Sequence, residues 1–345
     1  MYDKQMPKII SDVPEHVLQR IYKLVDKARY ANIDSFVRVA VENQLTLEAE
    51  DSQLPQGTPK SAHIPVNTKN GKDFHFPLDR VFQVLEPASF DDLNVSAVEN
   101  ERDLWLWGQV NRILPLKFAV RILARHQPPD RNAIDYWQFI RELMPEAREM
   151  GALLALQDIS LEKERGEGLA VAFPTGNDAH KAEERYRNLF IGSYRSDGKQ
   201  LGALPFLKLV TLLREGDSLS IGLTKAGLKF AELDSPPIDT ADFSRPLGDK
   251  EVDFYLTHIL QNVSGEVQAY KLILSAMSSG KTRREEVNKV ISTVYPKWTP
   301  EMVNTQRTGA MSRMYELGLF AKKKVGVTVL YTLTARGAEF LGRGS

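Results

Sequence analysis

The chain has 345 residues, contains no cysteine and carries 45 basic and 45 acidic side chains, so its formal net charge is zero. Without cysteine there is no disulfide framework, no Cys-ligated zinc, no iron–sulfur cluster and no thiol catalysis. The N-terminus lacks an apolar run of signal-peptide length, and no stretch reaches the roughly 20 apolar residues of a membrane span, so we expect a cytoplasmic protein without a membrane partner.

Residues 1–47 predict a short strand followed by two amphipathic helices, in the runs KIISDVPEHVLQRI and DSFVRVAVENQL. This order resembles the ribbon-helix-helix family, which implies an obligate dimer whose paired strands read the major groove. By strand alternation the outward side chains would be Lys8, Ile10 and Asp12. Asp repels phosphate, so we expect this module to form a homodimer rather than to read DNA. An ordinary helical hairpin is the alternative.

Residues 48–66 combine prolines with acidic side chains and predict a linker. Residues 67–177 predict a mainly helical unit whose order of elements resembles a winged helix. The elements expected there are two helices over Leu104–Ala124 that meet near Pro115, helices over Ala133–Met144 and Glu146–Leu156, and a hairpin that turns at Gly166–Gly168.

Residues 178–235 predict a further unit of this kind. Its expected elements are a helix over Ala179–Tyr194, a turn at Asp197–Gly198, a helix over Pro205–Leu213, a hairpin in LREGDSLSIGLT and a helix over Lys225–Leu233. Residues 236–248 are rich in proline and aspartate and predict a second linker.

Residues 249–345 have the most regular pattern in the chain. They predict helices over Lys250–Val263, Glu266–Met277 and Arg283–Tyr295, a helix capped by Thr299 that closes at Gly318, strands over Phe320–Lys324 and Thr328–Leu333, and a last helix over Ala335–Leu341.

The run MYELGLFAKKKVGVTVLYTLTARGAEFL resembles the recognition-helix end, wing and closing helix of the winged helix-turn-helix family, which implies DNA binding. The pattern L-T-x-x-G-x-x-F occurs twice, from Leu223 and from Leu333, each time between an alternating stretch and a helix. Thr can cap the helix, Gly permits a close backbone approach, and Phe returns to the core. We therefore predict a mainly α (α+β) fold, with a ribbon-helix-helix-like N-terminus followed by tandem winged-helix units.

The sequence offers no catalytic constellation. Gly280-Lys281-Thr282 ends like a phosphate-binding loop, but the glycine that this motif needs five residues earlier is Ser275, within a helix-like run. The six histidines have no metal-ligand spacing. We expect a non-enzymatic protein with no catalytic residue, no metal site and no cofactor.

The positive charge gathers at the C-terminus. Residues 281–345 hold twelve Lys and Arg against five Glu and no Asp, a net charge of +7, so the rest of the chain carries −7. On a wheel of the capped helix the core positions are Val303, Ala310, Met314 and Leu317, with Met311 at the edge. Small polar side chains opposite them suit a major groove, and flanking arginines and wing lysines suit phosphates.

The candidate DNA-binding residues are Arg283, Arg284, Asn304, Thr305, Arg307, Thr308, Ser312, Arg313, Lys322, Lys323 and Lys324. They predict sequence-specific or structural binding of duplex DNA, by a transcriptional regulator or by the DNA-recognition subunit of a larger complex. The neutral total charge leaves a second interpretation open, in which the chain is a protein–protein adaptor whose winged helices contact a partner protein.

Overall fold

The computed structural model describes Glu86 and residues 105–163, 166–176, 178–194, 198–325 and 328–343. They belong to one compact unit, Gly71–Ser345. Helices dominate it, with small antiparallel sheets, as the α+β class predicts. The ribbon-helix-helix-like module over residues 1–47 and the linker over 48–66 lie outside the described residues, so the module and the dimer stay predictions.

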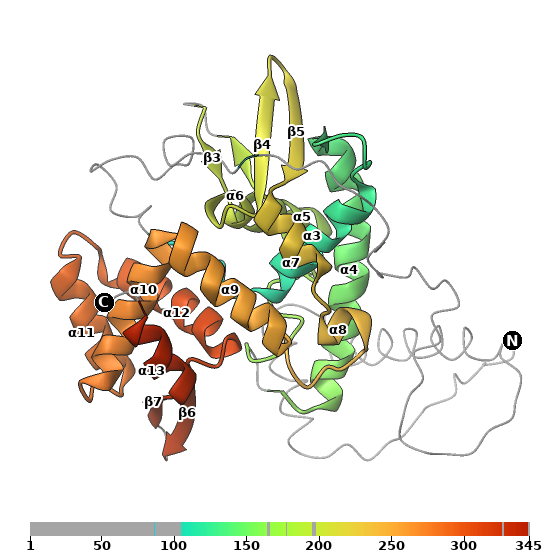
Figure 1. Cartoon of the computed structure of the whole chain (residues 1–345). Helices are drawn as coiled ribbons and strands as arrows, with labels where there is room; N and C mark the ends of the chain where they lie inside the picture. Colours follow the sequence, from blue (N-terminus) through green and yellow to red (C-terminus); the bar gives the residue numbers. More distant parts are fainter. Residues whose placement is uncertain are drawn as a thin grey trace, which may run out of the picture. The chain divides into compact units, whose positions relative to one another are not determined.

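The first half of the described chain, residues 105–239, contains twelve elements among its described residues (Figure 1). They are α3 (Leu114–His126), β1 (Ile134–Asp135), α4 (Tyr136–Ser160), α5 (Ala179–Tyr186), the π-helical turn η2 (Arg187–Ile191), β2 (Ser193–Tyr194), β3 (Gln200–Leu201), α6 (Ala203–Phe206), β4 (Val210–Glu215), β5 (Ser218–Leu223), α7 (Lys225–Glu232) and α8 (Pro236–Asp239). Its sheet has the order β1-β5-β4, and β2 pairs with β3.

The second half, residues 249–343, follows the predicted order of elements. They are α9 (Asp249–Asn262), α10 (Ser264–Ser278), α11 (Arg284–Val294), α12 (Pro300–Glu316), β6 (Phe320–Val325), β7 (Thr328–Leu333) and α13 (Ala335–Gly342). The Thr299 side chain accepts the N–H of Met302 and so caps α12. Gly318 ends that helix region at φ +68°, a conformation that favours glycine. The predicted order of elements in this half is confirmed.

The first half differs from its prediction before Leu114. Residues 105–113 form no helix, although their Leu- and Trp-rich composition predicted one, and α3 begins with Pro115 in its first turn. Trp105 packs edge-on against Tyr295 and Trp298 of the second half, with ring centroids 5.5 and 5.2 Å away. This long-range aromatic packing overrides the local helical pattern.

Further corrections concern α4 and the turns after it. The two helices predicted over residues 133–156 are one helix, α4, which contains Pro145. The hairpin predicted at Gly166–Gly168 is wrong, because the described residues there form turns. The Asp158 carboxylate accepts the N–H groups of Leu169 and Ala170, at 2.8 and 2.9 Å, and so satisfies backbone donors that a strand ladder would otherwise pair.

The predicted unit over residues 178–235 is also partly revised. The helix expected to reach Tyr194 ends in η2, because Gly192 (φ +131°) turns the chain into β2. The helix expected over Pro205–Leu213 is only the short α6, since β4 begins at Val210. The β4–β5 hairpin and α7 are confirmed.

The two halves share a joint between hairpin and closing helix, built by the L-T-x-x-G-x-x-F motif. In each copy the Thr side chain accepts the N–H of the motif Gly and caps the helix. The Thr N–H donates to a leucine carbonyl, that of Leu209 or Leu319. A Cβ on Gly227 or Gly337 would lie only 1.8 or 2.0 Å from that carbonyl oxygen, so the helix approaches the strand this closely only with glycine.

We call α4 in the first half and α11 in the second half the middle helix. In both halves a residue just before this helix, here called the edge residue, contacts the hairpin. In the first half Ile134, just before α4, pairs with Ile221 on the second hairpin strand. In the second half the carbonyl of Thr282, just before α11, accepts the N–H of Tyr331, again on the second hairpin strand. The chain therefore repeats one arrangement: helix, edge residue, helix, helix segment, hairpin and closing helix.

Two buried ion pairs lie where a second linker was predicted, over residues 236–248: one fixes α8 within the first half, and the other joins the halves. Arg121 of α3 contacts Asp239 of α8 with both terminal nitrogens, at 2.8 and 2.9 Å. Lys117 of α3 lies 3.3 Å from Glu251 of α9, with both side chains fully buried, and burial lowers the pKa of Lys117 to about 8. Within this stretch Pro236, Pro237 and Leu247 are buried, whereas residues 240–245 are exposed or half-buried.

Candidate nucleic-acid interface

The candidate interface centres on α12. The side chains predicted to face the core are buried, with Val303 at 1% exposure and Ala310, Met314 and Leu317 at 0%, and Met311 is 5% exposed. This part of the prediction is confirmed. The inner face of α12 is fixed by packing, so only its outer side and its flanks remain for a ligand.

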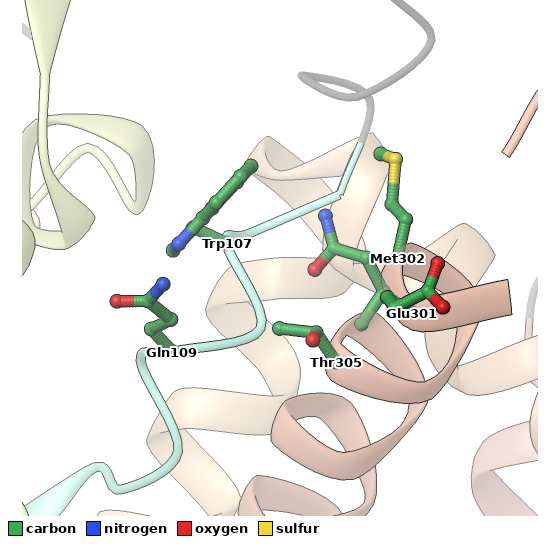
Figure 2. A pocket seen from close by; sticks show the side chains of 6 residues that line it. Trp107, Gln109, Glu301, Met302 and Thr305 are labelled. Atoms are coloured by element: carbon green, nitrogen blue, oxygen red, sulfur yellow. The ribbon is translucent and has the colours of Figure 1, made fainter. Parts of the chain in front are cut away.

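Residues 105–113, here called the 105–113 segment, cover one flank of α12. A Cβ on Gly309 would lie 2.1 Å from the carbonyl oxygen of Gly108, so the two backbones touch. Thr305 lines a pocket of ≈ 220 Å³ together with Trp107 and Gln109. Figure 2 shows Thr305 on the side of α12 that faces this segment. The predicted stripe of groove-facing side chains is therefore partly covered, and Thr305 belongs to the covered flank.

Arg313, predicted as a phosphate contact, does not reach the surface. Its side chain is fully buried and makes a bidentate ion pair with Glu266 of α10, at 2.6 and 2.8 Å. It also donates to the carbonyl oxygen of Val110. Because both carboxylate oxygens are engaged, this guanidinium joins α12 to the core, and we remove Arg313 from the candidate interface. Ser312 is only half-buried and stays beside the covered flank.

The open side of α12 is a narrow stripe. Glu301, Thr308 and Tyr315 are exposed and follow each other at intervals of seven residues, which places them on one line along the helix. Tyr315 was missed from the sequence, although this spacing alone would have extended the stripe to it. The stripe offers one acidic group, one hydroxyl group and one aromatic ring to a ligand.

Two arginines meet beside this stripe. Arg284, the first residue of α11, and Arg307 of α12 both donate to the side-chain oxygen of Asn304, at 2.7 and 2.9 Å. Arg307 also donates to Asn288, at 2.7 Å, and to the hydroxyl oxygen of Thr308. In the part of the chain that the structure describes, neither guanidinium pairs with a carboxylate. Burial lowers the pKa of Arg307, as expected for a cation taken partly out of water.

The three lysines of β6 have different surroundings. Lys322 pairs with Glu167, at 3.1 Å, and its ammonium lies 4.2 Å from the ring centroid of Tyr315. Lys323 points to the opposite face of the strand by alternation, and Lys324 shares the face of Lys322. All three are exposed. The ammonium group of Lys322 is therefore engaged by Glu167 and Tyr315, whereas Lys323 lies on the opposite face of the hairpin.

We call the surface that remains the α11–α12 face. Its exposed members are Arg283, Arg284, Thr308, Tyr315 and Lys324; Asn304 is half-buried and Arg307 is buried behind them, at 4% exposure, and Lys323 lies on the other face of the hairpin. Arg283 is exposed just before α11. The face combines cations with hydroxyl, amide and aromatic groups, a composition that suits phosphates and base edges.

Within the described ranges, no three His, Cys, Asp or Glu side chains gather closely enough to hold a metal ion. None of the described helices has both the length and the apolar character needed to cross a bilayer. Comparison with protein-family models, curated proteins and solved structures found no match to this chain.

Proposed function

We propose that this chain binds duplex DNA through the α11–α12 face, as a transcriptional regulator or as the DNA-recognition subunit of a larger assembly. The resemblance of residues 249–345 to winged helix-turn-helix proteins supports this, and so does the order of elements in the second half. The observation that carries the proposal is the exposed Arg284, which shares Asn304 with the buried Arg307; neither has a carboxylate partner among the described residues.

This arrangement suits a phosphate. A guanidinium that is oriented by neutral amide oxygens keeps its positive charge and loses little rotamer entropy when an anion arrives. Lys323 and Lys324 add positive charge on the two faces of the hairpin. Thr308 is exposed, and its hydroxyl oxygen accepts a hydrogen bond from Arg307 at 3.0 Å. Its small side chain is therefore the candidate for contact with base edges.

The proposal is tested by fluorescence anisotropy with labelled 25-base-pair duplexes over a range of salt concentrations. For the triple variant R284A/K323A/K324A we expect weaker binding to every sequence, and a salt slope reduced by about 3, since each phosphate contact contributes about 0.9. The matched control K225A/K229A/K250A removes three exposed lysines of α7 and α9. It should bind as the parent does.

Recognition of the DNA sequence is tested by substituting two threonines of α12 one at a time. Thr308→Ala should change the preference among duplexes with little effect on the salt slope, because base edges carry the sequence information. Thr305→Ala, on the flank covered by the 105–113 segment, should leave that preference unchanged. If folded parent protein binds no duplex even at low salt, the adaptor function replaces this proposal.

A further inference from the structure

The first half carries an arginine held against an exposed tryptophan. Trp137, the second residue of α4, is 47% exposed, which is unusual for so large an aromatic side chain. The guanidinium carbon of Arg187 lies 5.1 Å from the centroid of its ring. The positive charge of Arg187 also acts on Tyr136, the first residue of α4, because it lowers the pKa of a hydroxyl group whose pKa burial raises. Two aromatic side chains at the start of one helix therefore orient this guanidinium.

This pair corresponds in position to the arginines of the α11–α12 face. In each half the middle helix follows an edge residue that pairs with the second hairpin strand. In the second half Arg307, on the helix before the hairpin, lies against Asn288 of the middle helix. In the first half Arg187, in the helical segment that follows α4, lies against the first turn of the middle helix. Both halves thus present an oriented arginine beside the start of their middle helix.

The charge of Arg187 is not neutralised by its neighbours. No ion pair of Arg187 with a carboxylate occurs among the residues that the structure places. Nearby cations behave differently, because Arg148 pairs with Glu183 at 3.6 Å and Lys181 pairs with Asp178 at 3.1 Å. A ring under the guanidinium fixes its plane and leaves N–H donors at its edge for an anion.

The backbone at Arg187 departs from a regular helix. Arg187 opens the π-helical turn η2, and Gly192 then redirects the chain into the β2–β3 ribbon. Single π-helical turns within helices are often found at functional sites. The interruption also means that the segment before the hairpin of the first half is broken into α5, η2 and α6, whereas the second half has the continuous 17-residue α12 at that place. A contact from this site would therefore go to the sugar–phosphate backbone and not to the bases.

We propose that Arg187, oriented by Trp137, is a second DNA contact of this chain and binds a backbone phosphate of duplex DNA. This inference rests on the proposed function. It assigns separate tasks to the two halves, because the second half reads base edges through Thr308, whereas the first half adds affinity that is the same for every sequence.

The test compares two neighbouring arginines. Arg187→Ala should weaken binding on the order of tenfold at low salt and reduce the salt slope by about 1, equally for unrelated duplexes, because one charged hydrogen-bonded contact is lost. Arg185→Ala removes the same charge two residues earlier, from an exposed position of α5 without a role in the proposed site. It should bind DNA as the parent does.

The positioning role of Trp137 needs its own measurement. Trp105 and Trp298 are buried, so in a Trp107→Phe background the exposed tryptophan is Trp137. Its emission should change when duplex is added, and Arg187→Ala should remove that change. Trp137→Leu should weaken binding about as much as Arg187→Ala, and the double variant should be no weaker than either, since both remove the same contact.

Three outcomes would overturn the inference. If Arg187→Ala binds as the parent does while R284A/K323A/K324A binds weakly, the second contact is absent and the proposed function stands. If Arg185→Ala loses as much affinity as Arg187→Ala, the effect is one of general charge. If the folded parent binds no duplex at all, both the inference and the proposed function fail.

Discussion

Glu316 is a carboxyl group enclosed where the 105–113 segment meets α12. Its side chain is 5% exposed, it accepts the N–H of Ile113 at 2.6 Å, and the Arg112 guanidinium lies 3.5 Å away. Burial raises its pKa from the ordinary 4.5 to about 7, because desolvation of the carboxylate outweighs the attraction of Arg112. The folded protein therefore favours the protonated carboxyl group.

This raised pKa gives stability a definite dependence on pH. Between pH 4.5 and 7 the folded state binds this proton more tightly than the unfolded state does, so the stability that it contributes is complete below about pH 4.5 and is lost as the pH rises through 7. The full effect is at most roughly 3 kcal/mol. In Glu316→Gln, urea unfolding at pH 5 and at pH 8 should give more similar free energies than in the parent. An identical pH dependence in both proteins would contradict this assignment.

At the scale of single residues, the candidate interface could be predicted only in part from the sequence. Helical spacing correctly separated the buried side of α12 from Thr308 and Asn304. It could not show that Arg313 is buried, because its partner Glu266 lies 47 residues earlier in the chain. Arg187 and Trp137 were missed for the same reason, since they meet only when α4 and η2 pack together.

Among the elements, the 105–113 segment is the one whose structure depends most on other parts of the chain. It lies along α12 because two glycines, Gly108 and Gly309, allow the backbones to touch. The second half, by contrast, could be predicted almost completely, because the Thr299 cap, the Gly318 terminus and the alternating hairpin are local signals. Predictions from local patterns were wrong where tertiary contacts determined the conformation.

Gly309→Ala tests the contact between the 105–113 segment and α12, because that contact decides whether the substitution raises or lowers the free energy of unfolding. Alanine normally stabilises a helix interior by about 1 kcal/mol relative to glycine. Here the added Cβ would lie 2.1 Å from the Gly108 carbonyl oxygen, so we expect destabilisation by about 2 to 3 kcal/mol in urea unfolding. Gly342→Ala is the control, because its Cβ would meet no atom within 4 Å. Stabilisation by Gly309→Ala would mean that the segment does not pack on α12.

On the scale of the whole molecule, the start of the predicted second linker is packed against α3. Asp239 accepts from Arg121 and from the N–H of Ser235, and Pro236 and Pro237 are buried. Proline and aspartate predicted a linker here because they are frequent in loops. In this chain they instead form α8 and its ion pair.

Limited proteolysis distinguishes these possibilities. We expect residues 235–239 of the parent to resist cleavage, because they form the buried and half-buried α8 and the residue before it. Asp239→Ala removes the carboxylate that Arg121 contacts, a loss of about 3 to 5 kcal/mol for a buried pair, so cleavage there should accelerate. Mass spectrometry identifies the fragments. Early release of a C-terminal fragment of about 100 residues from the parent would show that the halves are separable.

The joint that both halves share also bears on ancestry. A side chain at Gly227 or Gly337 would collide with a carbonyl oxygen of the main chain, which cannot rotate away as a side chain can. Mutation is therefore free to alter the helix surfaces and the hairpin tips, while these two glycines and their capping threonines resist replacement. We expect distant relatives that contain both halves to keep this short joint after the remaining sequence has diverged, so the joint is the feature by which such relatives could be recognised.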